Sequence, residues 1–109
     1  MGDNDLIPGT LEMLILRILA LQPEHGFGIQ QRIEQISGGV FVVNPGSLLP
    51  ALRRIERSGW ARSEWGETAS HRKAKYYRLT ASGRRRLGRE QREWSQQAAA
   101  IAKILEARA

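Results

Sequence analysis

The chain of 109 residues contains no cysteine. Disulfide bonds and thiolate metal sites are therefore excluded, and nothing in the composition requires an oxidising compartment. Unbroken apolar runs such as 13–16 and 40–43 are far shorter than the ~18 residues that a membrane-spanning helix needs. The first five residues are polar and acidic, unlike the start of a secretory signal peptide. These absences predict a cytoplasmic protein without a membrane segment.

Arrangements typical of catalysis are also missing. The two histidines, His25 and His71, lie far apart, and neither has a nucleophile at a recognisable spacing. The pair Gly26 and Gly28 is followed by Gln31 where a dinucleotide-binding loop needs a third glycine. The scattered acids form no recognisable pattern of metal ligands. We therefore expect no catalysis, no metal and no cofactor.

Positive charge, by contrast, is abundant and unevenly placed. Residues 53–92 contain thirteen Lys or Arg and four acids, a net charge of +9. Residues 1–52 contain two Arg and five acids, a net charge of −3, and residues 93–109 contain two of each sign. A basic block in a mildly acidic frame favours a polyanionic partner. An arginine-rich solvated face would give the same count.

Hydrophobic periodicity predicts two helices in the first third of the chain. The first should begin at an N-cap, Thr10, and end near Leu21, because Pro23 follows. Its apolar face is formed by Leu11, Leu14, Ile15, Ile18 and Leu19. A tight turn at 25–28 opens the second helix, which should end at 37–39. Its buried stripe is expected to consist of Ile29, Ile33 and Ile36.

A third, amphipathic helix follows in the middle of the chain. Either Asn44 or Ser47 can cap it. We favour Ser47, because Pro50 then lies in the first turn, where its missing N–H breaks no intrahelical hydrogen bond. The helix should run to about Ser58, with Gly59 as the residue that ends it. Its inward face is expected to consist of Leu48, Leu52 and Ile55.

Two short strands and a basic turn are predicted after the third helix. Residues 60–65 and 75–79 have strand character, and 66–74 form the turn between them. The β-branched run at 40–43 is either an extended connector or a further strand. Together with the three helices, this pattern predicts a mainly α fold with a small β-wing, a winged helix-turn-helix.

The last helix is expected to follow an N-cap, Thr80, and to run to about Leu105. Leu87, Trp94 and Ile101 lie seven residues apart, and Gln91, Ala98 and Leu105 follow four residues after each. So long an apolar seam extends beyond a three-helix core and should bury against a second copy of the chain, in a C2 homodimer. The alternative is that it folds back on the first helix of its own chain, and in a dimer both contacts can hold. The expected interface residues are Leu11, Leu87, Trp94, Ala98, Ile101 and Leu105.

A winged helix-turn-helix presents its third helix to the major groove of double-stranded DNA, and its wing lies by the neighbouring backbone. Candidate DNA contacts on the third helix are Ser47, Arg53, Arg54 and Arg57. Candidate contacts at the wing tip are His71, Arg72, Lys73 and Lys75. The alternatives are a solvated basic face, a salt bridge from Arg57 to Glu56 or Glu64, and an exposed turn that contacts nothing.

Four segments carry a resemblance to a known family. They are residues 11–16, 25–29, 44–52 and 76–83, and their order and spacing resemble the PadR family of bacterial transcriptional regulators. The single last helix resembles the compact branch of that family. The resemblance implies a dimeric winged-helix repressor that binds a pseudo-palindromic operator. It divides the chain into a DNA-binding part, 1–80, and a dimerisation helix, 81–109, within one compact structural domain.

The resemblance also extends the set of candidate sites. It places Leu49 and Pro50 on the DNA-facing side, but family members typically have Tyr where this chain has Leu49, so no hydroxyl contact is expected there. It implies a possible effector pocket at the dimer interface, where Trp94 could stack on a small aromatic effector. A packed interface tryptophan is the simpler interpretation of Trp94.

Two other functions are compatible with the same sequence. The first is a nucleic-acid-binding protein that uses the basic block without sequence preference. The second is a dimeric module for ligand or protein interaction that has lost DNA binding.

Overall fold

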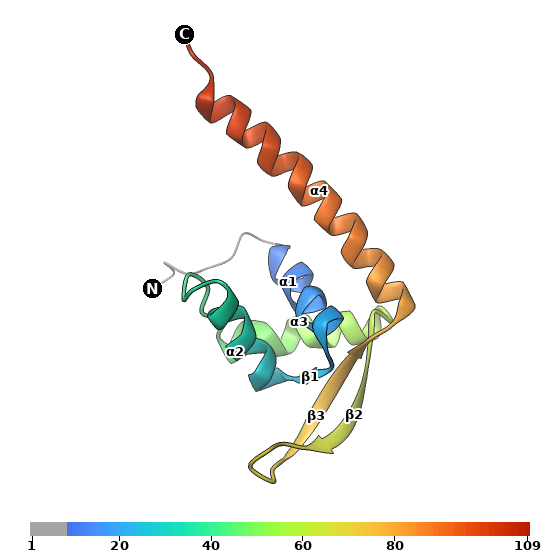
Figure 1. Cartoon of the computed structure of the whole chain (residues 1–109). Coiled ribbons are helices and arrows are strands. Elements are labelled where there is room, and N and C mark those ends of the chain that lie inside the picture. Colours follow the sequence, from blue (N-terminus) through green and yellow to red (C-terminus); the bar gives the residue numbers. More distant parts are fainter. Residues whose placement is uncertain (1–8) are drawn as a thin grey trace.

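The computed structural model describes residues 9–109, and its architecture is the predicted one, a small helical bundle with a β-wing and a long last helix (Figure 1). Residues 1–8, which include the acidic start and the beginning of the predicted DNA-binding part, lie outside the described residues. The elements follow in the order α1 (Thr10–Leu21), β1 (Glu24–His25), α2 (Gly26–Ile36), α3 (Pro45–Arg57), β2 (Ala61–Glu67), β3 (Lys73–Leu79) and α4 (Ala81–Glu106).

The hydrophobic core lies where the first three helices meet the base of the wing. The predicted inward face of α3 is buried. On the predicted face of α1, Ile15, Ile18 and Leu19 are buried and Leu11 and Leu14 are partly buried, and Leu16, which was not predicted to face inward, is buried as well. Tyr77, Leu79 and Leu87 close the core from the side of β3 and α4. The stripe predicted for α2 is correct for Ile29 and Ile33 and wrong for Ile36, which is exposed. Ile36 is the last residue of α2, and it borders an open apolar hollow between α1 and α2 where no third helix packs.

Two helix starts differ from the prediction. Asn44, not Ser47, caps α3: its Oδ1 accepts the backbone N–H of Ser47 at 3.0 Å. Pro45 then occupies the first helical position, for which its ring presets φ, and Pro50 lies inside the helix, where its missing N–H removes one intrahelical bond. The cap of α1 is Gly9 in the left-handed conformation, with φ 89°. Thr10 is the first helical residue.

The cap of α3 leads to a stability prediction. We expect Asn44→Ala to lower the free energy of unfolding by about 1 kcal/mol, because it removes the side-chain hydrogen bond that caps the first turn. Ser47→Ala should change it by less than about 0.5 kcal/mol, because no hydrogen bond joins the Ser47 hydroxyl to any described residue. Urea unfolding of the two variants at one protein concentration tests this, and equal destabilisation would contradict the placement of the cap.

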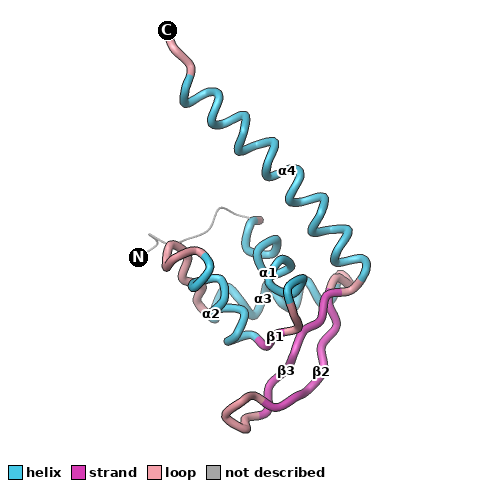
Figure 2. Tube along the Cα trace, in the orientation of Figure 1, coloured by secondary structure: helices cyan, strands magenta, loops and turns pink. Residues whose placement is uncertain are grey.

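The sheet has three antiparallel strands in the order β1-β3-β2 (Figure 2). Strands β2 and β3 pair from Ala61 with Leu79 to Glu67 with Lys73, so the wing turn is 68–72 and not the predicted 66–74. Gly66 lies in β2 opposite Ala74, and the ring of Tyr76 covers it, so that a Cβ there would lie 2.9 Å from Tyr76 Cδ1. The two-residue β1 was not predicted. The run 40–43 is a connector, which a 2.5 Å hydrogen bond from Gln30 Nε2 to the Val43 carbonyl holds against α2.

Helix α4 begins against the base of the wing and then leaves the core (Figure 1). Thr80 caps it as predicted, accepting the N–H of Gly83 at 3.0 Å and donating to the Gly59 carbonyl at 2.7 Å. Only Gly83 and Leu87 of this helix are buried. Across residues 9–109, no helix is both long and apolar enough to cross a membrane.

Candidate nucleic-acid interface

The exposed face of α3 carries two arginine side chains on one side of the helix. Arg53 and Arg57 lie four residues apart, and Pro50 lies three residues before Arg53 on the same side. The opposite side is buried through Leu48, Ala51, Leu52 and Ile55. No carboxylate within residues 9–109 pairs with Arg53 or Arg57. Both guanidinium groups are therefore open to an external anion.

The third arginine of α3 has a partner within the chain. Arg54 Nε donates to Glu12 Oε2 of α1 at 2.8 Å, which holds the side chain to the helix behind α3. The salt bridge considered for Arg57 is not formed. Glu56 accepts a hydrogen bond from the Ser63 hydroxyl at 2.6 Å and lies 3.6 Å from Lys75 Nζ. Glu64 lies 3.7 Å from Arg78.

The tip of the wing is a hydrogen-bonded turn. Thr68 N donates to the Arg72 carbonyl at 2.8 Å, and Thr68 Oγ1 accepts the N–H of Arg72 at 3.1 Å. His71 has φ 63°, a left-handed conformation that few residues other than glycine adopt. Its Nδ1 lies 3.7 Å from Glu67 Oε1. His71 and Arg72 thus lie at the tip, as predicted, and the Arg72 side chain is exposed.

Lys73 and Lys75 do not belong to the tip. Both lie in β3, because the paired strands extend further than the sequence pattern indicated. Lys73 Nζ lies 5.9 Å from the ring centroid of Trp65, and Lys75 Nζ lies 6.0 Å from that of Tyr77. Burial raises the pKa of the Tyr77 phenol, and the Lys75 ammonium opposes that shift. Of these two lysines, Lys75 is thus held by Glu56 and Tyr77, whereas Lys73 lies beside an exposed tryptophan.

A groove of about 850 Å³ separates α2 and α3 from the wing. It is lined by Leu49 of α3, by Arg72 and Lys73 of the wing, and by Phe27 and Trp65, which are 64% and 66% exposed. Neither aromatic residue was predicted from the sequence to belong to the site. An isolated large aromatic in the first turn of a helix, beside glycines that leave it uncovered, is the signal that could have found Phe27.

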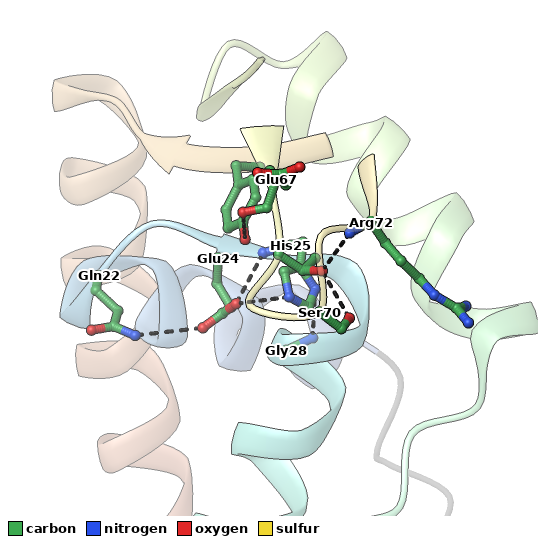
Figure 3. A network of polar contacts seen from close by, with 9 residues as sticks. Gln22, Glu24, His25, Gly28, Glu67, Ser70 and Arg72 are labelled. Atoms are coloured by element: carbon green, nitrogen blue, oxygen red, sulfur yellow. Dashed lines mark hydrogen bonds and ion pairs between the residues drawn. The ribbon is translucent and has the colours of Figure 1, made fainter. Parts of the chain in front are cut away.

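A small network joins the start of α2 to the wing (Figure 3). His25 Nδ1 accepts the N–H of Gly28 at 3.0 Å, and Glu24 Oε2 accepts the N–H of His25 at 3.2 Å. The His25 ring packs edge-on against Tyr76 at 5.1 Å, and the Tyr76 hydroxyl donates to the Glu67 carbonyl at 3.3 Å. His25 is therefore a helix cap that fixes α2 relative to β3. Residues 9–109 contain no cluster of acids and histidines able to hold a metal ion.

The family model described as "Transcriptional regulator PadR-like family" matches residues 15–89, which include α2, α3, the wing and the start of α4. The chain belongs to the PadR family. With its winged-helix fold, this PadR-family protein is a DNA-binding transcriptional regulator. In the described residues, one helix, α4, follows the wing.

Solved structures of transcriptional regulators agree with this assignment, and one curated relative is similar in sequence. A transcriptional regulator from Clostridium thermocellum has a TM-score of 0.84 and 26% identity, over 94% of this chain and 99% of that one. A PadR family regulator from Eggerthella lenta has a TM-score of 0.78 and 31% identity, over 92% of this chain and 85% of that one. An uncharacterised protein of Lysinibacillus sphaericus is 28% identical over 85% of each chain.

The apolar seam of α4 divides into two parts in this PadR-family chain. Leu87 is only 5% exposed and packs into the chain's own core, so the first part folds back as the alternative interpretation held. Leu11 of α1 is partly buried against the same core. Beyond this point Trp94, Ile101 and Leu105 are exposed, as is Ile104, which the heptad pattern had not selected.

The arginines at the start of α4 have mixed surroundings. Arg86 donates to Glu90 Oε2 at 2.9 Å, and its guanidinium lies 4.7 Å from the ring centroid of Trp60. Arg84, Arg85 and Arg89 are exposed. Arg86 is therefore a structural residue that joins α4 to the base of the wing.

Proposed function

We propose that this PadR-family protein is a repressor that binds a pseudo-palindromic operator in double-stranded DNA as a homodimer. The observation that carries the proposal is the pair Arg53 and Arg57, which lie on the exposed face of α3 without a carboxylate partner in residues 9–109. Charges left open on a helix that a winged-helix fold presents to DNA are suited to phosphate oxygens or to guanine edges.

In this arrangement α3 lies in the major groove, and Ser47 and Pro50 near its start face the DNA. Arg72 and His71 at the wing tip, with Lys73 behind them, contact the flanking backbone or minor groove. Arg54 and Lys75 have smaller roles, because their charges already face Glu12 and Glu56. Two α3 helices related by a dyad would lie about one DNA turn apart, or a multiple of it.

The dimer would form through the second part of α4. Trp94, Ala98, Ile101 and Leu105 lie on one side of the helix, and the core of their own chain leaves most of this seam uncovered. Residues up to 80 would then act as the DNA-binding part and α4 as the dimerisation helix. A small aromatic effector stacked on Trp94 is a further prediction that depends on this dimer.

The test is a titration of the protein against the DNA upstream of its own gene and against a scrambled duplex. Fluorescence anisotropy at two salt concentrations should show a preference of about 10³-fold or more for the native duplex. Equal and steeply salt-dependent affinities would favour a non-specific nucleic-acid-binding protein. No binding to either duplex would favour the interaction module.

The same assay tests the placement of α3. We expect Arg53→Ala to weaken operator binding by about tenfold, because each half-site loses a charge-assisted contact. Arg108→Ala, an exposed residue beyond the end of α4, is the control and should leave the affinity unchanged. Equal affinities of the two variants would contradict the proposed docking of α3.

A further inference from the structure

The start of α3 offers DNA almost no polar side chain. In a recognition helix of this type the residues near the N-terminus contact the base edges. Within the first two turns the exposed residues are Pro45, Gly46, Ser47, Leu49 and Pro50. They provide one hydroxyl and no amide, carboxylate or guanidinium, and the first arginine follows only at Arg53. Bidentate hydrogen bonds to a base are therefore unavailable where this helix should approach the bases most closely.

Leu49 is the large apolar side chain at this point. It is 48% exposed and lines the groove between α3 and the wing, near Phe27. Four residues on, Arg53 lies only about 40° further around the helix, so the two share a face. Arg72 and Lys73 line the same groove. The apolar spot is thus bordered by cations, which suits an occupant that is apolar at one point and polyanionic around it.

We infer that Leu49 reads the C5-methyl group of a thymine in the major groove. The methyl group is the apolar feature that distinguishes one base pair from the others there, and aliphatic side chains recognise it by contact. The inference rests on the proposed function and deepens it: each half-site contains a thymine whose methyl group contributes to affinity through Leu49.

The experiment begins with a duplex selected from random sequences by the wild-type protein. Each thymine of one half-site is then replaced in turn by deoxyuridine, which removes the methyl group and leaves base pairing unchanged. We expect one position at which the replacement weakens binding by about fourfold, which is the change in affinity that corresponds to the transfer free energy of one methyl group. The anisotropy titration is repeated with Leu49→Ala, Leu49→Met and Leu21→Ala.

The variants separate contact from general weakening. In Leu49→Ala, thymine and deoxyuridine duplexes should bind equally, whereas Leu49→Met should retain a difference. Leu21 is the matched control, because it is an exposed leucine of nearly the same accessibility, 47%, at the end of α1. Leu21→Ala should keep both the affinity and the fourfold difference.

Two results would overturn the inference while leaving the proposed function intact. One is strong preference for the selected duplex with no position sensitive to loss of the methyl group. The other is a methyl effect of the same size in Leu49→Ala. Failure of the selection to yield any duplex preferred over a scrambled one would instead reject sequence-specific recognition, and the inference with it.

Discussion

Ile101→Glu is expected to leave the protein monomeric and to weaken operator binding by about 100-fold or more. Ile101 is 57% exposed in the single chain and lies on the side of α4 that also carries Trp94 and Leu105. A carboxylate buried there against a second copy of the helix would have no counter-ion. A monomer binds one half-site only. In the dimer, binding of the first half-site raises the effective concentration of the second subunit at the other half-site, and the monomer loses this gain in affinity. Light scattering after size-exclusion chromatography reports the mass, and anisotropy the affinity.

The control for this variant adds the same charge elsewhere on the helix. Gln96 lies on the opposite side of α4 and is exposed, so Gln96→Glu should keep both the dimer mass and the affinity. If Ile101→Glu remained dimeric, the seam would not be the interface. If it became monomeric and still bound the full operator with native affinity, the two-site model would be wrong.

Gly83→Ala is expected to lower the free energy of unfolding by about 3 kcal/mol, at the upper end of what overpacking usually costs. A Cβ at Gly83 would lie 2.0 Å from the Trp60 carbonyl oxygen and 2.7 Å from Leu79 Cδ1. The oxygen cannot move freely, because it accepts the N–H of Thr80 at 3.0 Å. The start of α4 would have to move away from the wing. Urea unfolding at a fixed protein concentration gives the change.

Gly88 provides the matched control for Gly83. It lies in the same helix, and a Cβ there would meet only the flexible end of Arg92, at 3.5 Å. Gly88→Ala should therefore raise the free energy of unfolding by up to about 1 kcal/mol, through helix propensity alone. Destabilisation of equal size in both variants would show that the contact with Trp60 is not what requires glycine at position 83.

The elements with strong local signals could be predicted from the sequence. The apolar faces of α1 and α3 and the Thr80 cap of α4 lie where periodicity and capping chemistry placed them. Ile36 shows the limit of periodicity, because the pattern indicates which side of a helix faces inward and not whether anything covers it. The predicted cap of α3 was wrong because Asn44 and Ser47 are both favourable capping residues. Ser47 was preferred because it would place Pro50 in the first turn, but this helix accommodates Pro50 in its interior.

The candidate site divides in the same way. The sequence showed that cations gather in residues 53–92, but not which of them have partners within the chain. Arg54 pairs with a residue 42 positions away, and Lys75 with Glu56 on another element. Such pairs depend on the crossing of α1 with α3 and on how the wing packs against α3. The exposure of Phe27 and Trp65 in the groove has the same origin.

By itself, the sequence determined the mainly α class with a β-wing, the basic charge that favours a polyanionic partner, and the family. Periodicity, composition and short motifs determine these three properties, and all of them can be read from the chain without knowing its long-range contacts. Tertiary structure decided which arginines stay open, how far the wing strands pair and where the seam of α4 leaves its own core. These depend on contacts between residues far apart in the chain, where distance and burial, rather than residue type, set the interaction energy.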